Sequence, residues 1–407
     1  MKPPKTAYIL LWFPKPSETF VFREVVNLRN MGLPLKVYTL YGELRRGLSQ
    51  EMKMMSQDVT RLGIPFLRTA LPDLLHWWRK DRSRTAHLLR TVPFRRWHGL
   101  EKGGENLWAA LGAMRLAQWF EQEGIEHIHA PWASGPATAA WVASRLTGIP
   151  FSFTGRAWDI FPADGALGEK IRDAAFVRSE TATNIPYLAS FVGGDTSKIF
   201  LTYNGVPLTE HREAPVAMTR PLRLLAVGRF VGKKGFDFLL RACRILADKG
   251  MDFHLTLAGD GPRGVQLKRL ANKLGIRGRV SFPGFVSYDR ISELFAAADM
   301  LIMPSVVHAS GDRDGIPTVI MEALMHRLPV IATDVAGIAE VIEDGVTGLL
   351  IREKDSGAIA AAVERFARDR DGAVAMAERG RTKVRQMFDP HVCHEKVFRL
   401  FVEKGRG

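Results

Sequence analysis

Short apolar runs and one-sided apolar stretches alternate from the start of the chain. Residues 7–12 are continuously apolar, which is typical of a strand buried in a parallel sheet. The stretch after Ser17, its expected N-cap, repeats apolar residues at helical spacing until Gly32. Residues 35–40 form the next apolar run. The first forty residues therefore predict strand, helix and strand, the beginning of a doubly wound α/β domain.

The same rhythm continues to about residue 205 and then restarts. Further strands are expected at 127–129, 149–154, 174–178 and 198–201, with helices at 105–123 and 134–146. A polar, irregular stretch at 210–220 predicts a hinge. After it, strands are expected at 223–227, 254–258, 279–282, 300–303 and 330–332. The pattern predicts two doubly wound, Rossmann-like α/β domains.

Composition agrees with two domains in one chain. At 407 residues the chain exceeds the size at which a single hydrophobic core stops growing. Hydrophobic residues make up 46% of it, and no stretch approaches the roughly 20 apolar residues of a membrane span. The N-terminus lacks a signal-peptide pattern, so a cytoplasmic location is expected. Cys243 and Cys393 are far apart in sequence, which predicts two small buried side chains and neither a disulfide framework nor a zinc site.

The charge balance indicates an anionic partner. The net charge of +14 suits nucleic acid, anionic lipid or a phosphorylated substrate. Residues 76–97 interleave Trp, Phe and Leu with Arg and Lys, opposed by Asp81. Such a segment is typical of peripheral binding to an anionic membrane, and equally of a solvated basic face whose tryptophans belong to the core. No nucleic-acid recognition module surrounds it, so nucleic acid is not the expected partner.

Two segments of the second domain have the chemistry of an anion site. Residues 314–322 begin as a Gly/Pro turn and continue as an apolar helix, with Pro317 expected at the first helical position and acids at both ends, Asp314 and Glu322. A helix N-terminus binds anions through its unpaired N–H groups. Residues 228–237 form a basic loop with spaced glycines, which suits a phosphate. The alternative to an anion site is an ordinary helix cap at 314–322 and an ordinary exposed turn at 228–237.

In the first domain, polar residues follow three expected strands. Ser17, Glu18 and Thr19 lie near the end of the first, His129 closes the strand at 127–129, and Asp159 follows the strand at 149–154. Active sites of α/β domains form at such strand ends. Helix capping and satisfied structural polar groups are equally consistent with these residues.

Taken together, four motifs resemble the retaining, nucleotide-sugar-dependent glycosyltransferases of the GT-B fold, family 4 type. The resemblance covers nearly the whole chain and is most specific from 227 to 350. The motifs are Val227-Gly228-Arg229 with Lys233-Lys234-Gly235, Ala258-Gly259-Asp260-Gly261-Pro262, the segment 314–323, and Asp344-Gly345-Val346-Thr347-Gly348-Leu349-Leu350.

The resemblance implies two domains facing a central cleft. It implies an acceptor-binding domain at 1–205, a linker at 206–221, a donor-binding domain at 222–387 and a C-terminal helix at 388–407 that packs back on the first domain. Arg229 and Lys234 would bind the donor diphosphate, Asp314 the sugar hydroxyls and Glu322 the ribose. The other implied donor contacts are Gly228, Gly261, Phe285, Val286, Gly315, Ile316 and Thr318.

The first domain departs from the family pattern in two places. Members commonly have His where this chain has Arg156, and a second His where it has Pro131. Arginine is not a base at ordinary pH, but it stabilises phosphates and carboxylates. We therefore count His129 and Arg156, with Arg229, Lys234 and Asp314, as candidate catalytic residues. The candidate acceptor contacts are Ser17, Glu18, Thr19 and Asp159.

The sequence thus predicts a retaining hexosyltransferase that uses a UDP- or GDP-sugar as co-substrate, without another cofactor. The acceptor is expected to be lipid-linked or an oligosaccharide or polysaccharide, at the inner face of the membrane. No divalent metal is expected, although Asp312 and Asp314 form an Asp-x-Asp pair, because fixed basic groups already supply positive charge. A catalytically silent subunit that binds nucleotide sugars is the main alternative, and a sugar-nucleotide epimerase is another.

Overall fold

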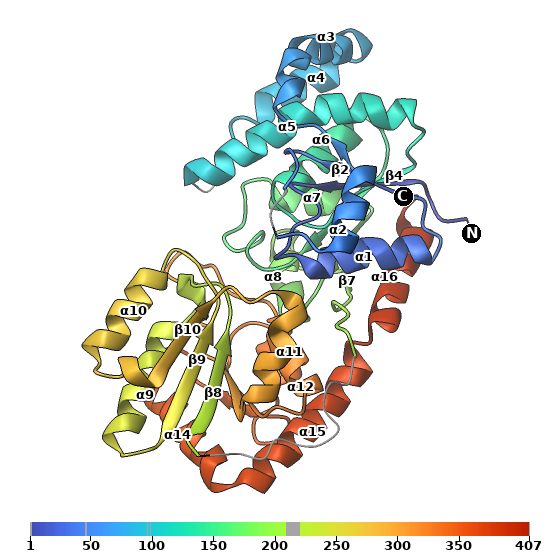
Figure 1. Ribbon diagram of the computed structural model, residues 1–407. Coiled ribbons are helices and arrows are strands. Elements are labelled where there is room, and N and C mark those ends of the chain that lie inside the picture. Colours follow the sequence, from blue (N-terminus) through green and yellow to red (C-terminus); the bar gives the residue numbers. More distant parts are fainter. Residues whose placement is uncertain (1, 45–46, 96, 98, 209–219, 407) are drawn as a thin grey trace. The chain divides into compact units, whose positions relative to one another are not determined.

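The computed structural model describes residues 2–44, 47–95, 97, 99–208 and 220–406. The chain divides into two compact units, Met1–Gly205 with His391–Gly407 and Val206–Pro390. Each unit is a parallel β-sheet with helices on both faces (Figure 1), which confirms the predicted α/β class. Apart from Arg220, the predicted hinge at 210–220 lies outside the described residues.

The first unit has a seven-stranded sheet in the order β3-β2-β1-β4-β5-β6-β7, with every pair parallel. The strands are β1 (Thr6–Leu10), β2 (Leu35–Thr39), β3 (Thr60–Arg61), β4 (His127–Ala130), β5 (Phe151–Gly155), β6 (Phe176–Ser179) and β7 (Ile199–Leu201). Its helices are α1 (Thr19–Asn30), α2 (Gln50–Met55), α3 (Ala70–Lys80), α4 (Arg82–Thr91), α5 (Gly99–Gln122), α6 (Gly135–Thr147), α7 (Leu167–Asp173), α8 (Asn184–Ser190) and α16 (Pro390–Lys404), with 3₁₀ turns η1 (Ser56–Asp58) and η2 (Ile64–Arg68).

Alternate residues of β1 enter two different cores, as the two-residue period of a strand requires. Ala7 and Ile9 belong to the core under α5 and α6. Tyr8 and Leu10 belong to the core shared with α1 and α16. The C-terminal helix α16 therefore completes one face of the first unit, beside α1 (Figure 1).

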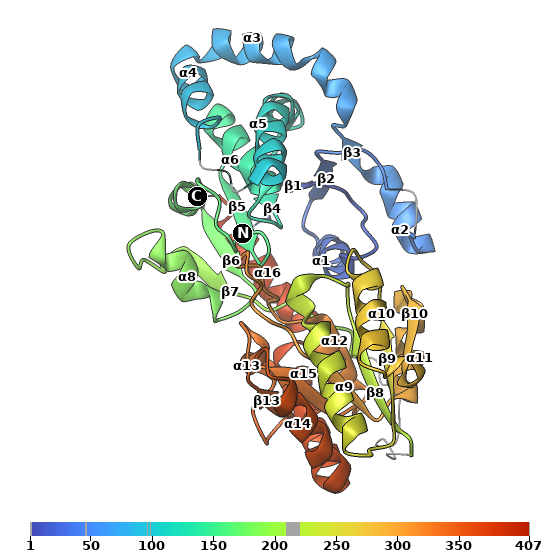
Figure 2. The same cartoon turned by 90° about the vertical axis from the view of Figure 1, so that its left-hand side faces the viewer.

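On the other face the helices form two layers. In Figure 2, α3 and α4 are the outermost elements, and α5 and α6 lie between them and the strands. Most of the 76–97 segment is thus helical. Among the described residues, no helix has both the length and the apolar character needed to cross a bilayer.

The second unit has a six-stranded sheet, also parallel throughout, in the order β10-β9-β8-β11-β12-β13. The strands are β8 (Leu222–Val227), β9 (Phe253–Ala258), β10 (Val280–Gly284), β11 (Met300–Met303), β12 (Val330–Thr333) and β13 (Leu349–Ile351). The helices are α9 (Phe236–Asp248), α10 (Gly264–Lys273), α11 (Tyr288–Ala297), α12 (Thr318–Met325), α13 (Ile338–Val341), α14 (Ser356–Arg368) and α15 (Arg370–Met387), with 3₁₀ turns η3 (Gly232–Lys234) and η4 (Arg277–Arg279). Figure 1 shows α9, α10 and α14 on one face of the sheet and α11 and α12 on the other.

Three details of the first unit differ from the sequence predictions. The first strand ends at Leu10, because the next two residues bend into a loop in which Trp12 packs on the ring of Tyr41. Helix α5 begins six residues before the predicted start at 105. The prediction missed these residues because they are largely exposed and have no apolar residues at helical spacing. The N-cap of α1 is Glu18, not Ser17, because Ser17 lies in the turn that precedes the helix. Both cysteines are free and buried, as predicted.

Candidate functional site

In the second unit, two loops meet where the strand order reverses. Strands β8 and β11 are neighbours, but the chain leaves β8 toward β9 and leaves β11 toward β12, on opposite sides. In doubly wound sheets, ligands bind beyond the carboxyl ends of the strands at such a point. The loops there are residues 228–235 and 304–317, joined by a hydrogen bond of 2.8 Å from the N–H of Val306 to the carbonyl of Lys233. The two predicted anion-binding segments are therefore adjacent.

Gly235 permits this close approach. Its φ is +62°, and a Cβ atom there would lie 1.9 Å from the carbonyl oxygen of Pro304. Both the left-handed backbone and the contact exclude a side chain. Any larger residue would push the turn that contains Lys233 and Lys234 away from the end of β11.

Two lysines and Asp314 form the centre of the site. Lys234 Nζ lies 2.8 Å from Asp314 Oδ2, which also accepts a hydrogen bond of 2.8 Å from Ser305. Lys233 Nζ lies 3.0 Å from Asp312 and 3.8 Å from Asp314. Burial by itself would raise the pKa of the Asp314 carboxyl, but Lys234 and Lys233 outweigh it and hold that pKa below its ordinary value. Two cations thus lie within ion-pair distance of one buried carboxylate.

Helix α12 begins beside this cluster. Pro317 is the N-cap, with ψ of 120°, and not the first helical residue as predicted, because its extended ψ keeps it outside the helix. Val319 and Ile320 are buried, whereas Glu322 lies half-buried four residues after Thr318. Gly315, Ile316 and Thr318 precede or open the helix, so the predicted backbone contacts lie at its N-terminus.

The remaining predicted donor residues extend along the same edge of the sheet. The loops after β8 and β9 are joined by the hydrogen bond from Phe230 N to the Asp260 carbonyl, 2.8 Å, and Gly261 packs against Phe230. The N–H of Gly259 in turn donates to Gly284 at the end of β10, directly before Phe285 and Val286. Phe285 is 67% exposed.

The loop that starts at Gly228 also carries an available cation. Arg229 is exposed and forms no ion pair within the described part of the chain. Unlike Lys234, it therefore needs to release no partner before it binds an anion.

In the first unit, His129 lies in the core. It is fully buried, its Nδ1 lies 2.7 Å from Ser152 Oγ, and its ring packs against Tyr8, Phe176 and Phe401. Burial holds the pKa of His129 well below its ordinary value, so the ring is neutral at neutral pH. In this arrangement the side chain reaches no solvent from which a substrate proton would come.

Arg156 is buried in a charged network at the end of β5. Its guanidinium donates to the Pro131 carbonyl at 2.8 Å, pairs with Glu180 and lies 4.6 Å above the ring of Phe20. Burial lowers the pKa of Arg156 to about 10, so it stays protonated at neutral pH. One nitrogen, Nη2, is buried without a hydrogen-bond partner among the described residues. Most of the guanidinium's hydrogen-bonding groups are therefore used in contacts within the protein.

The predicted acceptor contacts lie in loops beside Arg156. Glu18 pairs with Lys15 at 2.5 Å, and its second oxygen accepts a hydrogen bond of 3.3 Å from the Trp132 indole. Asp159 is buried, and its carboxylate accepts from the N–H groups of Ala133, Arg156 and Ala157. Asp159 thus ties together the loops after β4 and β5. Ser17 and Thr19 flank Glu18 at the start of α1.

Several residues of these sites were missed from sequence. In the second unit they are Lys233, which lies inside the predicted basic loop, and Ser305, which follows the predicted strand at 300–303. In the first unit they are Glu24, Arg178 and Glu180, which connect Tyr8 to Arg156 through buried ion pairs. The sequence contains one indication for Glu24. This acid lies on the same side of α1 as the buried apolar residues Val21, Val25 and Leu28.

Comparisons with known proteins agree on one family. The family model described as "Glycosyl transferases group 1" matches residues 209–383. The putative colanic acid biosynthesis glycosyltransferase WcaL of Salmonella typhimurium is 32% identical, over 97% of this chain and 99% of that protein. The amylovoran biosynthesis glycosyltransferase AmsK of Erwinia amylovora is 33% identical over 51% of each chain.

A solved structure shows the same fold. The crystal structure of Anabaena Alr3699/HepE in complex with UDP superimposes with a TM-score of 0.70, at 16% identity, over 98% of this chain and 99% of that one. With the sequence relatives, this establishes that the chain belongs to the group 1 glycosyltransferases and has the GT-B fold, family 4 type.

Proposed function

We propose that this glycosyltransferase moves a hexose from a UDP- or GDP-sugar to a lipid-linked or polysaccharide acceptor, with retention at the anomeric carbon, at the inner face of the membrane. The observation that carries the proposal is the Lys234–Asp314 pair at the junction of β8 and β11. A sugar diphosphate needs cations and free amides for its phosphates and a carboxylate for its hydroxyls. This pair of loops offers all three.

The residues of the site contact different parts of the donor. Arg229 and Lys234 neutralise the diphosphate and stabilise the charge that develops as it leaves, which is commonly the largest catalytic term. Asp314 is ionised and accepts hydrogen bonds from sugar hydroxyls. The amides at the start of α12 face sugar or phosphate oxygens, and Glu322 binds the ribose. The departing diphosphate takes the acceptor proton, so no buried histidine has to act as base.

The choice between UDP and GDP rests on relatives of both kinds. Anabaena Alr3699/HepE was crystallised with UDP and with UDP-glucose. A GDP-mannose-dependent phosphatidylinositol monomannoside mannosyltransferase of Mycobacterium tuberculosis is 30% identical over 66% of this chain. The second name also supports a lipid acceptor.

The first prediction tests the donor. UDP or GDP, with its sugar, is expected to raise the unfolding temperature by several degrees at about 100 times the dissociation constant, where binding contributes about 2.7 kcal/mol, while ADP leaves it unchanged. The same sugar, radiolabelled, should appear in a lipid-linked or polysaccharide product with release of free nucleotide. Absence of a shift with every nucleotide would contradict the proposal.

A second function is favoured by the first unit. His129 is buried, and Arg156 is held mostly by protein groups, as in a subunit that binds a nucleotide sugar without transferring it. Tight nucleotide binding without product, tested with a lipid-linked acceptor extract, would support this silent subunit. Product without any acceptor would instead indicate an epimerase.

The second prediction concerns metals. Asp312 and Asp314 are each paired with a lysine, so an added divalent cation would have to displace Lys233 and Lys234. We expect excess EDTA to leave the transfer rate unchanged within twofold. A rate that falls on chelation and returns with Mg²⁺ or Mn²⁺ would overturn the metal-free assignment.

A further inference from the structure

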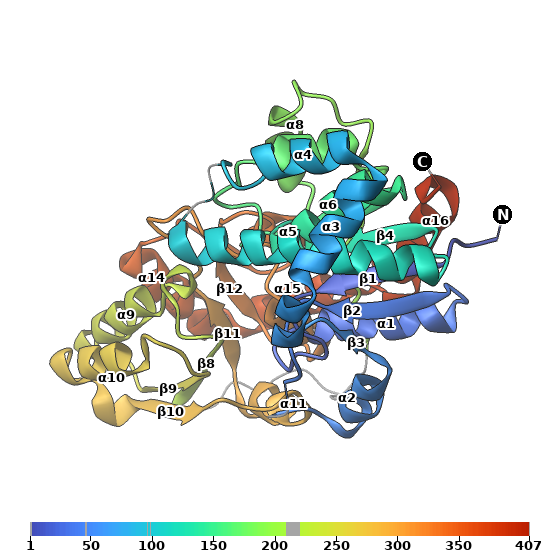
Figure 3. The same ribbon diagram turned by 90° about the horizontal axis from the view of Figure 1, so that it is seen from above.

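Helix α3 of the first unit is fixed to the protein by one face. The Trp77 side chain is fully buried, and its Nε1 donates to the carbonyl of Met114 on α5 at 2.8 Å. Asp73, one turn earlier, is buried against Arg115, also on α5, at 2.7 Å. Figure 3 shows α3 crossing over α5. These contacts fix which side of α3 points outward.

The outward side exposes leucines beside the polar residues His76 and Arg79. Leu71 is 65% exposed and Leu75 is 43% exposed, one helical turn apart. The 3₁₀ turn η2, which leads into α3, adds Ile64 at 74% and Leu67 at 49%. Four large aliphatic side chains, two on α3 and two on the 3₁₀ turn before it, are therefore exposed along one stretch of the chain, and α3 itself is among the outermost elements of this unit (Figure 2). Clustered exposed apolar side chains mark interaction sites, whereas single ones do not. We call these four residues the α3 face.

Cations border the α3 face. Arg68 and Arg79 are exposed, and neither forms an ion pair within the described residues. Arg82 lies over the Trp78 ring at 5.1 Å. The nearby acids do not offset this charge, because Asp73 turns inward to Arg115 and Asp81 caps α4 through the N–H of Arg84.

We infer that the α3 face docks on an anionic lipid bilayer. Exposed aliphatic side chains bordered by unpaired arginines match a surface of acyl chains and negative headgroups, because the former enter the apolar boundary and the latter are attracted to the headgroups. The α3 face lies before the predicted segment 76–97, in which Trp77 belongs to the core and Phe94 is 82% exposed. The inference rests on the proposed function in one respect: a lipid-linked acceptor would lie in a membrane, where the enzyme would have to reach it.

The third prediction tests this inference by co-sedimentation of the full-length protein with vesicles. Wild type should bind vesicles of phosphatidylcholine mixed with phosphatidylglycerol, bind pure phosphatidylcholine much less, and lose binding as salt rises. L71S/L75S should weaken binding to the mixed vesicles on the order of tenfold, from the lost apolar contact. R68Q/R79Q should weaken it by about the same factor, and only on anionic vesicles.

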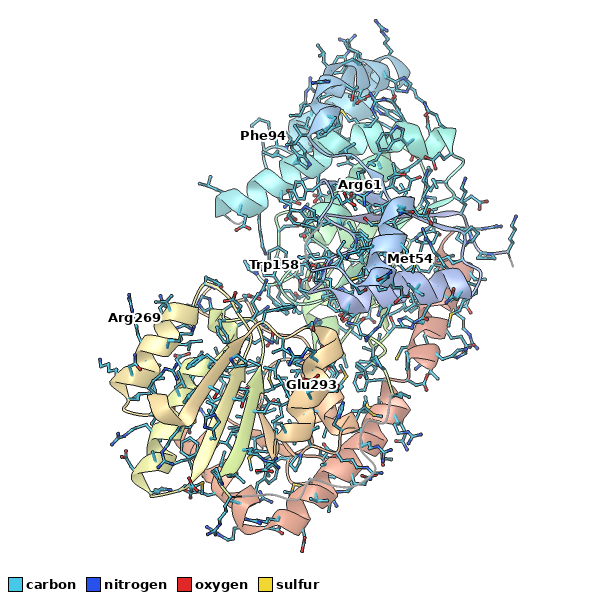
Figure 4. The ribbon with its side chains drawn as sticks, in the orientation of Figure 1. Met54, Arg61, Phe94, Trp158, Arg269 and Glu293 are labelled. Carbon is cyan, nitrogen blue, oxygen red and sulfur yellow. The ribbon has the colours of Figure 1, made fainter. Side chains whose placement is uncertain are left out.

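A matched control is available on another exposed helix. Val265 is 62% exposed on α10, and Arg269 projects from that helix into solvent (Figure 4). V265S/R269Q should bind vesicles like wild type. All three variants should keep the wild-type unfolding temperature and its shift with nucleotide, because no changed residue lies in the donor site.

Three results would overturn the inference. They are wild-type protein that does not bind anionic vesicles, α3-face variants that bind as well as wild type, and a wild-type dimer that L71S/L75S converts to monomer in light scattering while vesicle binding persists. The last would assign the face to a second copy of the chain. Vesicle binding without a nucleotide shift would leave this inference standing and contradict the proposed function instead.

Discussion

Replacement of Lys234 by alanine is expected to lower the rate of sugar transfer by about 10²–10³-fold, the usual effect of removing one preorganised group that stabilises a leaving anion. The side chain is mostly buried and ends 2.8 Å from Asp314. The variant therefore loses a cation at the diphosphate and a partner of the carboxylate that holds the sugar. Steady-state kinetics with the donor identified by thermal shift measure the change.

Two companion variants separate charge from folding. Lys234→Arg keeps the charge with a longer, planar group and should retain part of the activity. Lys249→Ala removes a lysine of the same unit whose exposed side chain pairs with Glu364 at 2.6 Å, and it should leave the rate unchanged. If Lys234→Ala transfers sugar at the wild-type rate with unchanged donor affinity, the diphosphate assignment is wrong.

The sequence revealed the second unit well because its site is built from local patterns. Each loop follows an apolar run, and its glycines and lysines are neighbours in sequence, so residues 228–235 and 314–322 stood out separately. The local pattern does not show that these two segments contact each other. Lys234 and Asp314 are 80 residues apart, and only the sheet order, with β11 next to β8, brings them together.

The first unit was harder because its charged groups pair across long separations inside the core. Glu24 and Arg178 are 154 residues apart, and nothing in the local pattern around either residue points to the other. Arg156 drew notice as a departure from the family pattern, but its partner Glu180 did not. Trp77 shows the same limit, since burial of that side chain depends on α5 lying under α3.

Glu24 gives the largest expected effect on stability. It is 1% exposed and accepts hydrogen bonds from Tyr8 and from Arg178, which is itself buried. Removing one partner of a buried ion pair costs about 3–5 kcal/mol, and here it leaves the buried Arg178 with only the longer pair to Glu180 at 3.7 Å. We expect Glu24→Ala to lower the free energy of unfolding of the first unit by that amount. All nine tryptophans lie in this unit, so urea titration followed by tryptophan fluorescence reports on it alone.

Controls identify the cause. Glu395→Ala removes an exposed ion pair with Arg399 on α16 of the same unit and should change stability by less than about 0.5 kcal/mol. The double variant Glu24→Leu/Arg178→Met should be more stable than Glu24→Ala, because it leaves no buried charge without a partner. If Glu24→Ala matches Glu395→Ala, the network contributes little to stability.

The pH dependence tests the charge itself. Burial alone would raise the pKa of Glu24, but Arg178 and Arg156, helped by Tyr8, lower it from 4.5 to about 2. A carboxyl whose pKa falls on folding stabilises the folded state fully above its unfolded pKa, and this contribution is lost as the pH drops through the folded pKa. The stability difference between wild type and Glu24→Gln should therefore be constant above about pH 5 and shrink between about pH 4.5 and 2. A difference that stays constant over that range would mean that the glutamate contributes through shape and hydrogen bonds, and that its charge is not what holds Arg178 in the core.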